Sequence, residues 1–375
     1  MNIPILPTFC PRTTERGVAR LLHLAALGLV TACGATDDAL GDASVGSPAD
    51  ASMGAPGDAD PPDAEVTPDM APAPANVTLR GLSEAEMCGH YQDDYLGPAV
   101  RYSTGEDPAS CAPGAMTAEG LAATRARLDW YRTLYGLPAL GQAEPAANEA
   151  AQRCALMVAA NEALSHDPPR DWRCFDDAGA EMAGRSNLYL GAGTPVSAVD
   201  LLVFDFGSED TLGHRRWVLA PGQRGHGFGF VAGTGGGASG FCQTVRGLGD
   251  PPVSWPEPVA YPPPGAFPAA LLSYTFQGVR VAAWSIGWDA ADFTGARLTL
   301  TDETTGAPVP LAADGAFRAL AEGFGSSAAL WRPANAPPVG GAWRVRIDGI
   351  VRRGSRTEPV IYVVELADCG ATAVF

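Results

Sequence analysis

Residues 117–136 read TAEGLAATRARLDWYRTLYG, and their apolar pattern is that of a helix. Thr117 can cap the helix, and Glu119 places a negative charge in its first turn, where that charge suits the helix dipole. From Leu121 to Tyr135, apolar residues recur at spacings of three, four and seven, the period of one buried helix face. Gly136 ends this pattern. The sequence therefore predicts an amphipathic helix over residues 117–135.

Two more helices and two strands are predicted downstream. Residues 144–164 begin with Glu-Pro, and proline is favoured at the first helical position. Residues 196–206 carry another helical stripe, and residues 225–231 and 241–248 are short apolar runs flanked by glycine. Because helices come first and strands follow, we expect an α+β fold in which helices pack on a sheet.

The sequence changes in character near residue 250. A proline-rich stretch is followed by alternating apolar and polar residues over 279–284, 297–300, 343–347 and 360–366. Such alternation between Gly, Pro and Asp turns is typical of antiparallel strands. We therefore expect one domain over residues 79–250 and a small β-rich domain over residues 251–375.

The first 33 residues have the features of a secretory signal. A basic segment precedes a ten-residue apolar run at 21–30, which is too short to span a membrane. The run leads into Val30-Thr31-Ala32-Cys33, which resembles a bacterial lipobox. On that resemblance the leader is cut before Cys33 and the cysteine is acylated, and more than one acyl chain gives a stable anchor. The alternative is an ordinary secretory signal with a chance cysteine.

Residues 34–78 have the composition of a disordered linker. They consist mainly of Ala, Asp, Gly, Pro and Ser, with nine acidic residues and no basic residue. This composition cannot bury enough apolar surface to offset chain entropy, and its charges and prolines favour an extended spacer. With the lipid anchor, the segment predicts a cell-envelope lipoprotein that faces the periplasm or the cell surface.

The composition also limits the kinds of partner. The net charge is −17, and all 25 basic residues are arginine. A general nucleic-acid binder needs a basic face to release counterions, so we expect no nucleic-acid partner. Nine of the negative charges lie in the linker, so the acidity says little about a substrate.

Six cysteines remain in the exported part after Cys10 and Cys33 are set aside. An even number in an exported protein predicts disulfides, and six cysteines allow 15 pairings. Proximity in sequence favours Cys88–Cys111 and Cys154–Cys174, which leaves Cys242–Cys369.

Residues 129–140, DWYRTLYGLPAL, resemble the first-helix signature of the CAP superfamily. This family, also called the SCP domain, includes cysteine-rich secretory proteins, venom allergens and pathogenesis-related proteins. Its pattern here is Asn-x-x-Arg, then Gly-Leu and Pro-Leu, and Asp129 replaces the asparagine. Further segments resemble family motifs in the same order: Leu164–His166, Ser186–Leu188, Ala198–Asp205 and Gly213–His214. The sequences of these segments are most similar to those of a bacterial exported branch of the family.

The resemblance implies a CAP-type α-β-α sandwich with a cleft lined by two histidines and two acidic residues. His166 and His214 take the histidine positions, Asp205 takes one glutamate position, and Ser186 replaces the other. His166, His214 and Asp205 meet the minimum of three protein ligands for a divalent metal such as zinc, and a metal-bound water could then act as a nucleophile. Glu181, five residues before Ser186, is a further candidate for the cleft.

The alternative is a purely structural role, in which His166 and His214 bond across the cleft and hold two segments together, with Asp205 orienting one imidazole. Trp217, which follows closely on His214, is expected in the core.

Three functions are open at this point. The first, which we favour, is a lipid-anchored exported CAP-domain protein that binds a small ligand, a glycan or a protein partner in its cleft. The second is a metal-assisted hydrolase that uses His166, His214 and Asp205. The third is a purely structural surface protein. One family glutamate is missing and no nucleophile is obvious, so we do not expect an enzyme, although a fold does not fix a function.

Overall fold

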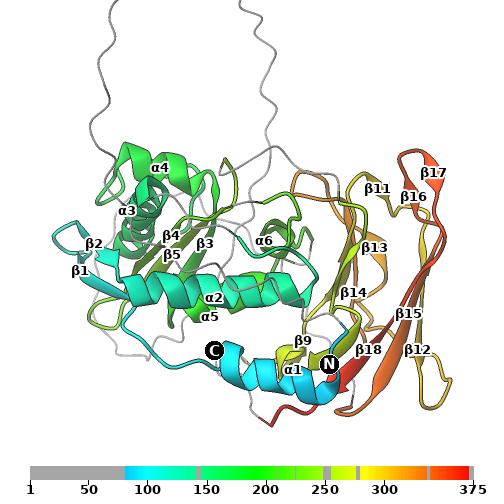
Figure 1. Ribbon diagram of the computed structural model, residues 1–375. Helices are drawn as coiled ribbons and strands as arrows, with labels where there is room; N and C mark the ends of the chain where they lie inside the picture. Colours follow the sequence, from blue (N-terminus) through cyan, green and yellow to red (C-terminus); the bar gives the residue numbers. More distant parts are fainter. Residues whose placement is uncertain are drawn as a thin grey trace, which may run out of the picture.

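The computed structural model describes residues 81–370 except 141–144, 209, 224, 248–254, 276–278, 336 and 337. The predicted leader (1–33), its Cys33 and the linker (34–78) lie outside the described residues. Within the described part, helices and several sheets confirm the α+β class (Figure 1). None of the helices described there is long and apolar enough to cross a membrane.

The three predicted helices are confirmed. Thr117 caps the first by accepting a hydrogen bond from the Gly120 backbone N–H, and Pro145 is the first residue of the second. In chain order the helices described are α1 (Glu84–His90), the π-helix η1 (Tyr91–Tyr95), α2 (Ala118–Leu134), α3 (Pro145–Asn161), α4 (Asp177–Ala183), α5 (Pro195–Phe204), α6 (Gly213–Val218) and the 3-10 helix η2 (Ala269–Leu271).

An antiparallel sheet in the order β3-β5-β4 lies among these helices. Its strands are β3 (Ser186–Gly191), β4 (Phe228–Val231) and β5 (Ser239–Thr244). On one face, Leu188 and Cys242 pack with apolar residues of α3. On the other, Tyr189 and Phe241 share a core with apolar residues of α2 and α5. Helices therefore cover both faces of the sheet, with α3 and α4 on one side and α2 and α5 on the other (Figure 1).

Two strand glycines explain how closely α3 approaches the sheet. A Cβ at Gly229 would lie 2.1 Å from the backbone of Ala151, and a Cβ at Gly240 would lie 2.3 Å from the carbonyl oxygen of Ala155. Only glycine fits at such distances. The glycine-flanked apolar runs of the sequence are thus strands that carry a helix at close range.

The C-terminal part is rich in β-structure, as predicted. Its two larger sheets have the orders β13-β14-β10-β6 and β12-β15-β18-β7, and the pair β18–β7 is parallel. Trp284 of the first sheet packs against Trp343 of the second, with ring centroids 5.7 Å apart. The C-terminal strands are β6 (Val259–Tyr261), β7 (Gly265–Pro268), β8 (Ser273–Thr275), β9 (Val279–Val281), β10 (Trp284–Gly287), β11 (Ala291–Asp292), β12 (Arg297–Asp302), β13 (Arg318–Ala319), β14 (Ala328–Trp331), β15 (Ala342–Asp348), β16 (Val351–Arg352), β17 (Ser355–Arg356) and β18 (Val360–Ala367).

A separate hairpin, formed by β1 (Ser103–Asp107) and β2 (Ala112–Met116), precedes α2 in the chain.

A buried arginine joins the helical part to the C-terminal strands. Arg215 of α6 donates to the carbonyl oxygens of Val203 and Ala283 and to the hydroxyl of Ser285. Its guanidinium also lies 3.9 Å from the ring centroid of Tyr261. Because one hydrophobic cluster runs through both parts, the C-terminal strands are packed against the helices that carry the predicted site.

All six cysteines of the described residues form disulfides, which confirms the prediction of oxidised cysteines, but the predicted pairs are wrong. In place of Cys88–Cys111, Cys154–Cys174 and Cys242–Cys369, the bonds are Cys88–Cys369, Cys111–Cys174 and Cys154–Cys242. The prediction used proximity in sequence, whereas packing decides the pairs. Helix α1 contacts β18, which ends near Cys369, and α3 lies on β5, which carries Cys242.

Candidate functional site

One small pocket is lined by both predicted histidines. His166 follows α3, His214 belongs to α6, and Ser186 at the start of β3 lines the same pocket. The cavity volume is about 10 Å³, which is room for about one water molecule. The other lining residues are Gly184, Arg185, Asn187, Gly213, Trp217, Val245, Arg246 and Phe324.

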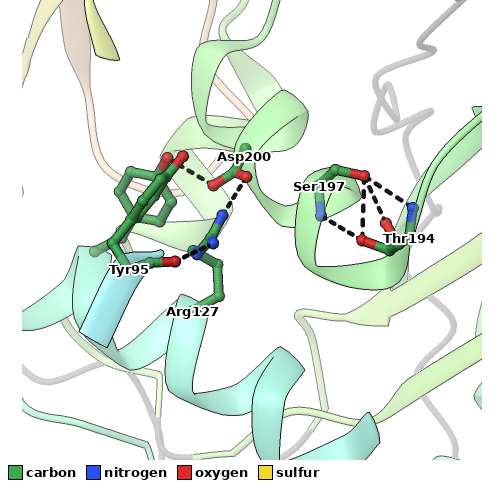
Figure 2. Close-up of polar contacts among 6 residues, drawn as sticks. Tyr95, Arg127, Thr194, Ser197 and Asp200 are labelled. Atoms are coloured by element: carbon green, nitrogen blue, oxygen red, sulfur yellow. Dashed lines mark hydrogen bonds and ion pairs between the residues drawn. The ribbon is translucent and has the colours of Figure 1, made fainter. Parts of the chain in front are cut away.

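The end of α5 orients His214. The helix begins at a capping box formed by Thr194 and Ser197 (Figure 2). It ends at Asp205, whose φ of 55° is in the left-handed region that non-glycine residues rarely adopt. The Asp205 carboxylate accepts a hydrogen bond from Nδ1 of His214 at 2.6 Å and one from the backbone N–H of Arg215 at 3.1 Å. His214 and Asp205 are both buried, so the imidazole is held in one orientation.

A backbone carbonyl orients His166 in the same way. Nδ1 of His166 lies 2.9 Å from the carbonyl oxygen of Ala183. A carbonyl or carboxylate oxygen can only accept, so Nδ1 carries the proton in both rings, and Nε2 is an acceptor whenever the ring is neutral. Neither Ala183 nor Asp205 lines the pocket. A hydrogen bond from Nδ1 of this kind fixes the tautomer and the orientation of an imidazole ring.

Asp205 is a hydrogen-bond partner of His214 and not a member of the pocket lining. Within the part of the chain that the structure describes, which contains all three predicted ligands, no group of three or more His, Cys, Asp or Glu is placed to hold a metal ion. The predicted ligand set of His166, His214 and Asp205 is therefore not a metal site in this structure. The reason is geometric, because the carboxylate lies behind the imidazole and is used on Nδ1 and on a backbone N–H.

The other two candidates have different positions. The Ser186 hydroxyl is in the pocket lining and donates to the hydroxyl of Thr244 at 3.5 Å. Glu181 is an exposed residue of α4 that pairs with Arg185 at 2.8 Å, and it does not line the pocket. Glu181 thus pairs with one pocket residue, Arg185, and does not itself line the pocket.

Two aromatic residues of the pocket were not predicted as site residues. Trp217 was expected in the core, but it is half-buried and lines the pocket, because residues 213–218 form helix α6. Phe324 comes from the C-terminal β-rich part, and no local pattern connects it with His214.

A second buried polar cluster lies against α2, away from the pocket. Arg127 bridges the carboxylate of Asp200 and the main-chain oxygen of Tyr95 (Figure 2). The Tyr131 hydroxyl donates to the other oxygen of Asp200 at 2.8 Å. Burial raises the pKa of Asp200, while the charge of Arg127 lowers it. None of these side chains lines the pocket, so the cluster holds α2, α5 and η1 together.

Comparisons of this chain with family models, with curated proteins and with solved structures find no match.

Proposed function

We propose that this chain is an exported, lipid-anchored protein of the CAP type that binds a small ligand, or the end of a glycan or protein partner, in the His166–His214 pocket. One observation carries the proposal: two histidines from distant segments line one pocket, and each is fixed through Nδ1. Ordered polar groups that converge on a concave site are the usual mark of ligand binding.

Two further features support the rest of the proposal. Helices on both faces of the β3-β5-β4 sheet agree with the sandwich that the CAP resemblance implies. Three disulfides agree with an oxidising compartment outside the cytoplasm. Replacing Cys33 by serine should move the protein from the membrane fraction to the soluble fraction, and unchanged fractionation would contradict the anchor.

The hydrolase is less well supported than the binding protein. Asp205 is occupied as the partner of His214, and the Ser186 hydroxyl bonds to Thr244 and to neither histidine. A serine nucleophile needs a base within hydrogen-bond reach. The residues described at the pocket are thus arranged for contact with a ligand.

The test is a binding screen on the full processed chain. Probes from three classes (monosaccharides, small carboxylates and phosphates, and short-chain amphiphiles) are examined by ligand-observed NMR. We expect at least one class to bind and His166→Ala to weaken that binding about tenfold. His90→Ala is the matched control, because His90 is outside the pocket and pairs with Asp94. Binding by no class, or binding unaffected by His166→Ala, would overturn the proposed function.

A further inference from the structure

The disulfide between Cys111 and Cys174 is more accessible than the other two. Of the six cysteines that the structure describes, only Cys111 is an exposed residue, and its partner Cys174 is half-buried. Exchange between a thiol and a disulfide depends on access of the incoming thiolate to one of the two sulfurs. The Cys111–Cys174 bond is therefore the one most open to a thiol from solution while the protein stays folded.

Both cysteines of this bond have an unusual backbone conformation. Cys111 has a φ of 59° and Cys174 a φ of 57°, in the left-handed region that non-glycine residues rarely adopt. The other four described cysteines lie outside this region. Such residues persist where their surroundings hold them, and they cluster at functional sites. Because the disulfide is part of what holds both residues, its cleavage removes a constraint on two strained positions.

A positive charge lies beside the less accessible sulfur. The carbonyl oxygen of Pro108 is 3.2 Å from a guanidinium nitrogen of Arg173 and 3.5 Å from Sγ of Cys174, so the guanidinium and this sulfur are neighbours. A nearby cation stabilises a thiolate, and the sulfur that is more stable as a thiolate leaves faster in exchange. The surroundings thus favour attack at the exposed Cys111 and departure of Cys174.

The two segments that the disulfide joins are each held by bonds of their own. In the turn at residues 108–111, between β1 and β2, the Asp107 carboxylate accepts hydrogen bonds from a main-chain N–H at 3.0 Å and from the Ser110 hydroxyl at 2.6 Å. On the other side, the Asn161 side chain at the end of α3 donates to the main-chain oxygen of Arg173 and accepts from its N–H. The disulfide can therefore open without the loss of either segment.

The same two segments line a cavity of about 320 Å³. Pro108 and Ala109 line it from the turn, and Asn161, Glu162 and Arg173 line it from the end of α3 and the connection that follows. The histidine pocket shares no lining residue with this cavity. The Cys111–Cys174 bond thus ties together two walls of a cavity in the size range that holds small molecules, roughly 300–1,000 Å³.

We infer that the Cys111–Cys174 disulfide is a thiol-exchange site, at which the thiolate of a dithiol reductant attacks Sγ of Cys111. The incoming sulfur forms a mixed disulfide with Cys111, the Cys111–Cys174 bond breaks, and its electron pair stays on Cys174 as a thiolate beside Arg173. The second thiolate of the reductant then attacks its own partner sulfur in the mixed disulfide. The reductant leaves oxidised to a disulfide, and Cys111 is released as a thiolate. This reaction is independent of ligand binding in the histidine pocket.

The experiment treats the full processed chain, with its three disulfides intact, with reduced glutathione at neutral pH. Glutathione has one thiol, so the mixed disulfide accumulates, and N-ethylmaleimide traps the free thiol for mapping by mass spectrometry. We expect glutathione on Cys111 and the maleimide on Cys174, with the other two disulfides reacting at least about tenfold more slowly. First reaction at another disulfide, equal rates for all three, or glutathione mainly on Cys174 would overturn the inference.

Three variants test the role of Arg173 as a positioning residue for the leaving sulfur. Arg173→Gln keeps a hydrogen-bond donor but removes the charge, and it should slow the exchange about fivefold, whereas Arg173→Lys keeps the charge and should restore most of the rate. Arg170→Gln is the control, because Arg170 is exposed and pairs with Asp177, and it should leave the rate unchanged. A variant that merely loosened the fold would exchange faster. An unchanged or faster rate in Arg173→Gln, or no recovery in Arg173→Lys, would therefore contradict this role.

Discussion

Asp200 lies in the middle of α5 and Asp205 caps its C-terminal end, and both are buried, but they belong to different regions of the molecule. Asp200 faces α2, where Arg127 and Tyr131 engage its two carboxylate oxygens. Asp205 turns toward His214, which lines the pocket. A buried charge alone therefore does not identify a functional site. The partner of Asp205 reaches a pocket, whereas the partners of Asp200 do not line it.

The largest loss of stability should come from breaking the buried polar cluster of Arg127, Asp200 and Tyr131. Arg127→Met removes the cation and leaves the buried Asp200 carboxylate unpaired. Breaking a buried ion pair from one side costs about 3–5 kcal/mol, so the free energy of unfolding, measured by urea denaturation with disulfides intact, should fall by that amount. The ligand affinity of the remaining folded protein should be unchanged.

The control for this substitution lies two residues away on α2. Arg125 makes a more exposed ion pair with Asp129 at 3.8 Å, and Arg125→Met should cost no more than about 1 kcal/mol. Equal losses for the two variants, or loss of ligand affinity in folded Arg127→Met, would show that the two regions are not distinct.

A smaller loss of stability, but a loss of binding, is expected at the other carboxylate. Asp205 accepts from both His214 and the Arg215 backbone, and an amide offers only one acceptor atom. Asp205→Asn must therefore break one bond, at a cost of about 1.5–3 kcal/mol for a bond to a charged group. Ligand affinity should fall about tenfold because His214 loses its fixed orientation.

Asp210→Asn serves as the comparison for Asp205→Asn, since Asp210 is 99% exposed in the connection between α5 and α6. It should change neither stability nor affinity. Full ligand affinity in Asp205→Asn would mean that the orientation of His214 does not contribute to binding.

The smallest change in stability is expected from His226, which is fully buried, as Asp200 is. Its ring stacks on Phe228 and contacts Gln243, and burial, aided by the charge of Arg132, lowers its pKa well below the ordinary value of 6.5. The unfolded chain binds a proton here below about pH 6.5, while the folded protein does not. The free energy of unfolding should therefore fall as pH decreases, by at most about 1.4 kcal/mol per pH unit.

His226→Phe keeps a ring against Phe228 and removes the titration. Urea denaturation at pH 7.5 and 5.5 should show a smaller loss of stability on acidification for this variant than for the natural protein. His90→Gln, at a half-buried position outside this contact, is the comparison variant. If His226→Phe shows the same acid sensitivity as the natural protein, then His226 is not protonated on unfolding.

The sequence predicted the local features of the fold and part of the site. Helix α2 is visible because Thr117 and the apolar spacing are signals within a single helix. The pocket position of His166 and His214 follows from motif order. The disulfide pairs and Phe324 were not predictable, because they depend on how α1 and the C-terminal strands dock on the rest of the chain. The sequence left Asp205 open as a metal ligand or as the residue that orients an imidazole, and its hydrogen bond to His214 matches the second of these.

The central claim is that His166 and His214 share one ligand pocket, and their ring nitrogens test it most directly. The chain has only five histidines, of which His23 lies in the predicted leader. Long-range ¹⁵N NMR should show the proton on Nδ1 of both His166 and His214 at a pH where the rings are neutral. On titration with the tightest-binding probe, the Nε2 signals of both residues should move together, while those of His90 and His226 stay in place. Movement of only one of the two pocket histidines, or of neither, would contradict the shared pocket.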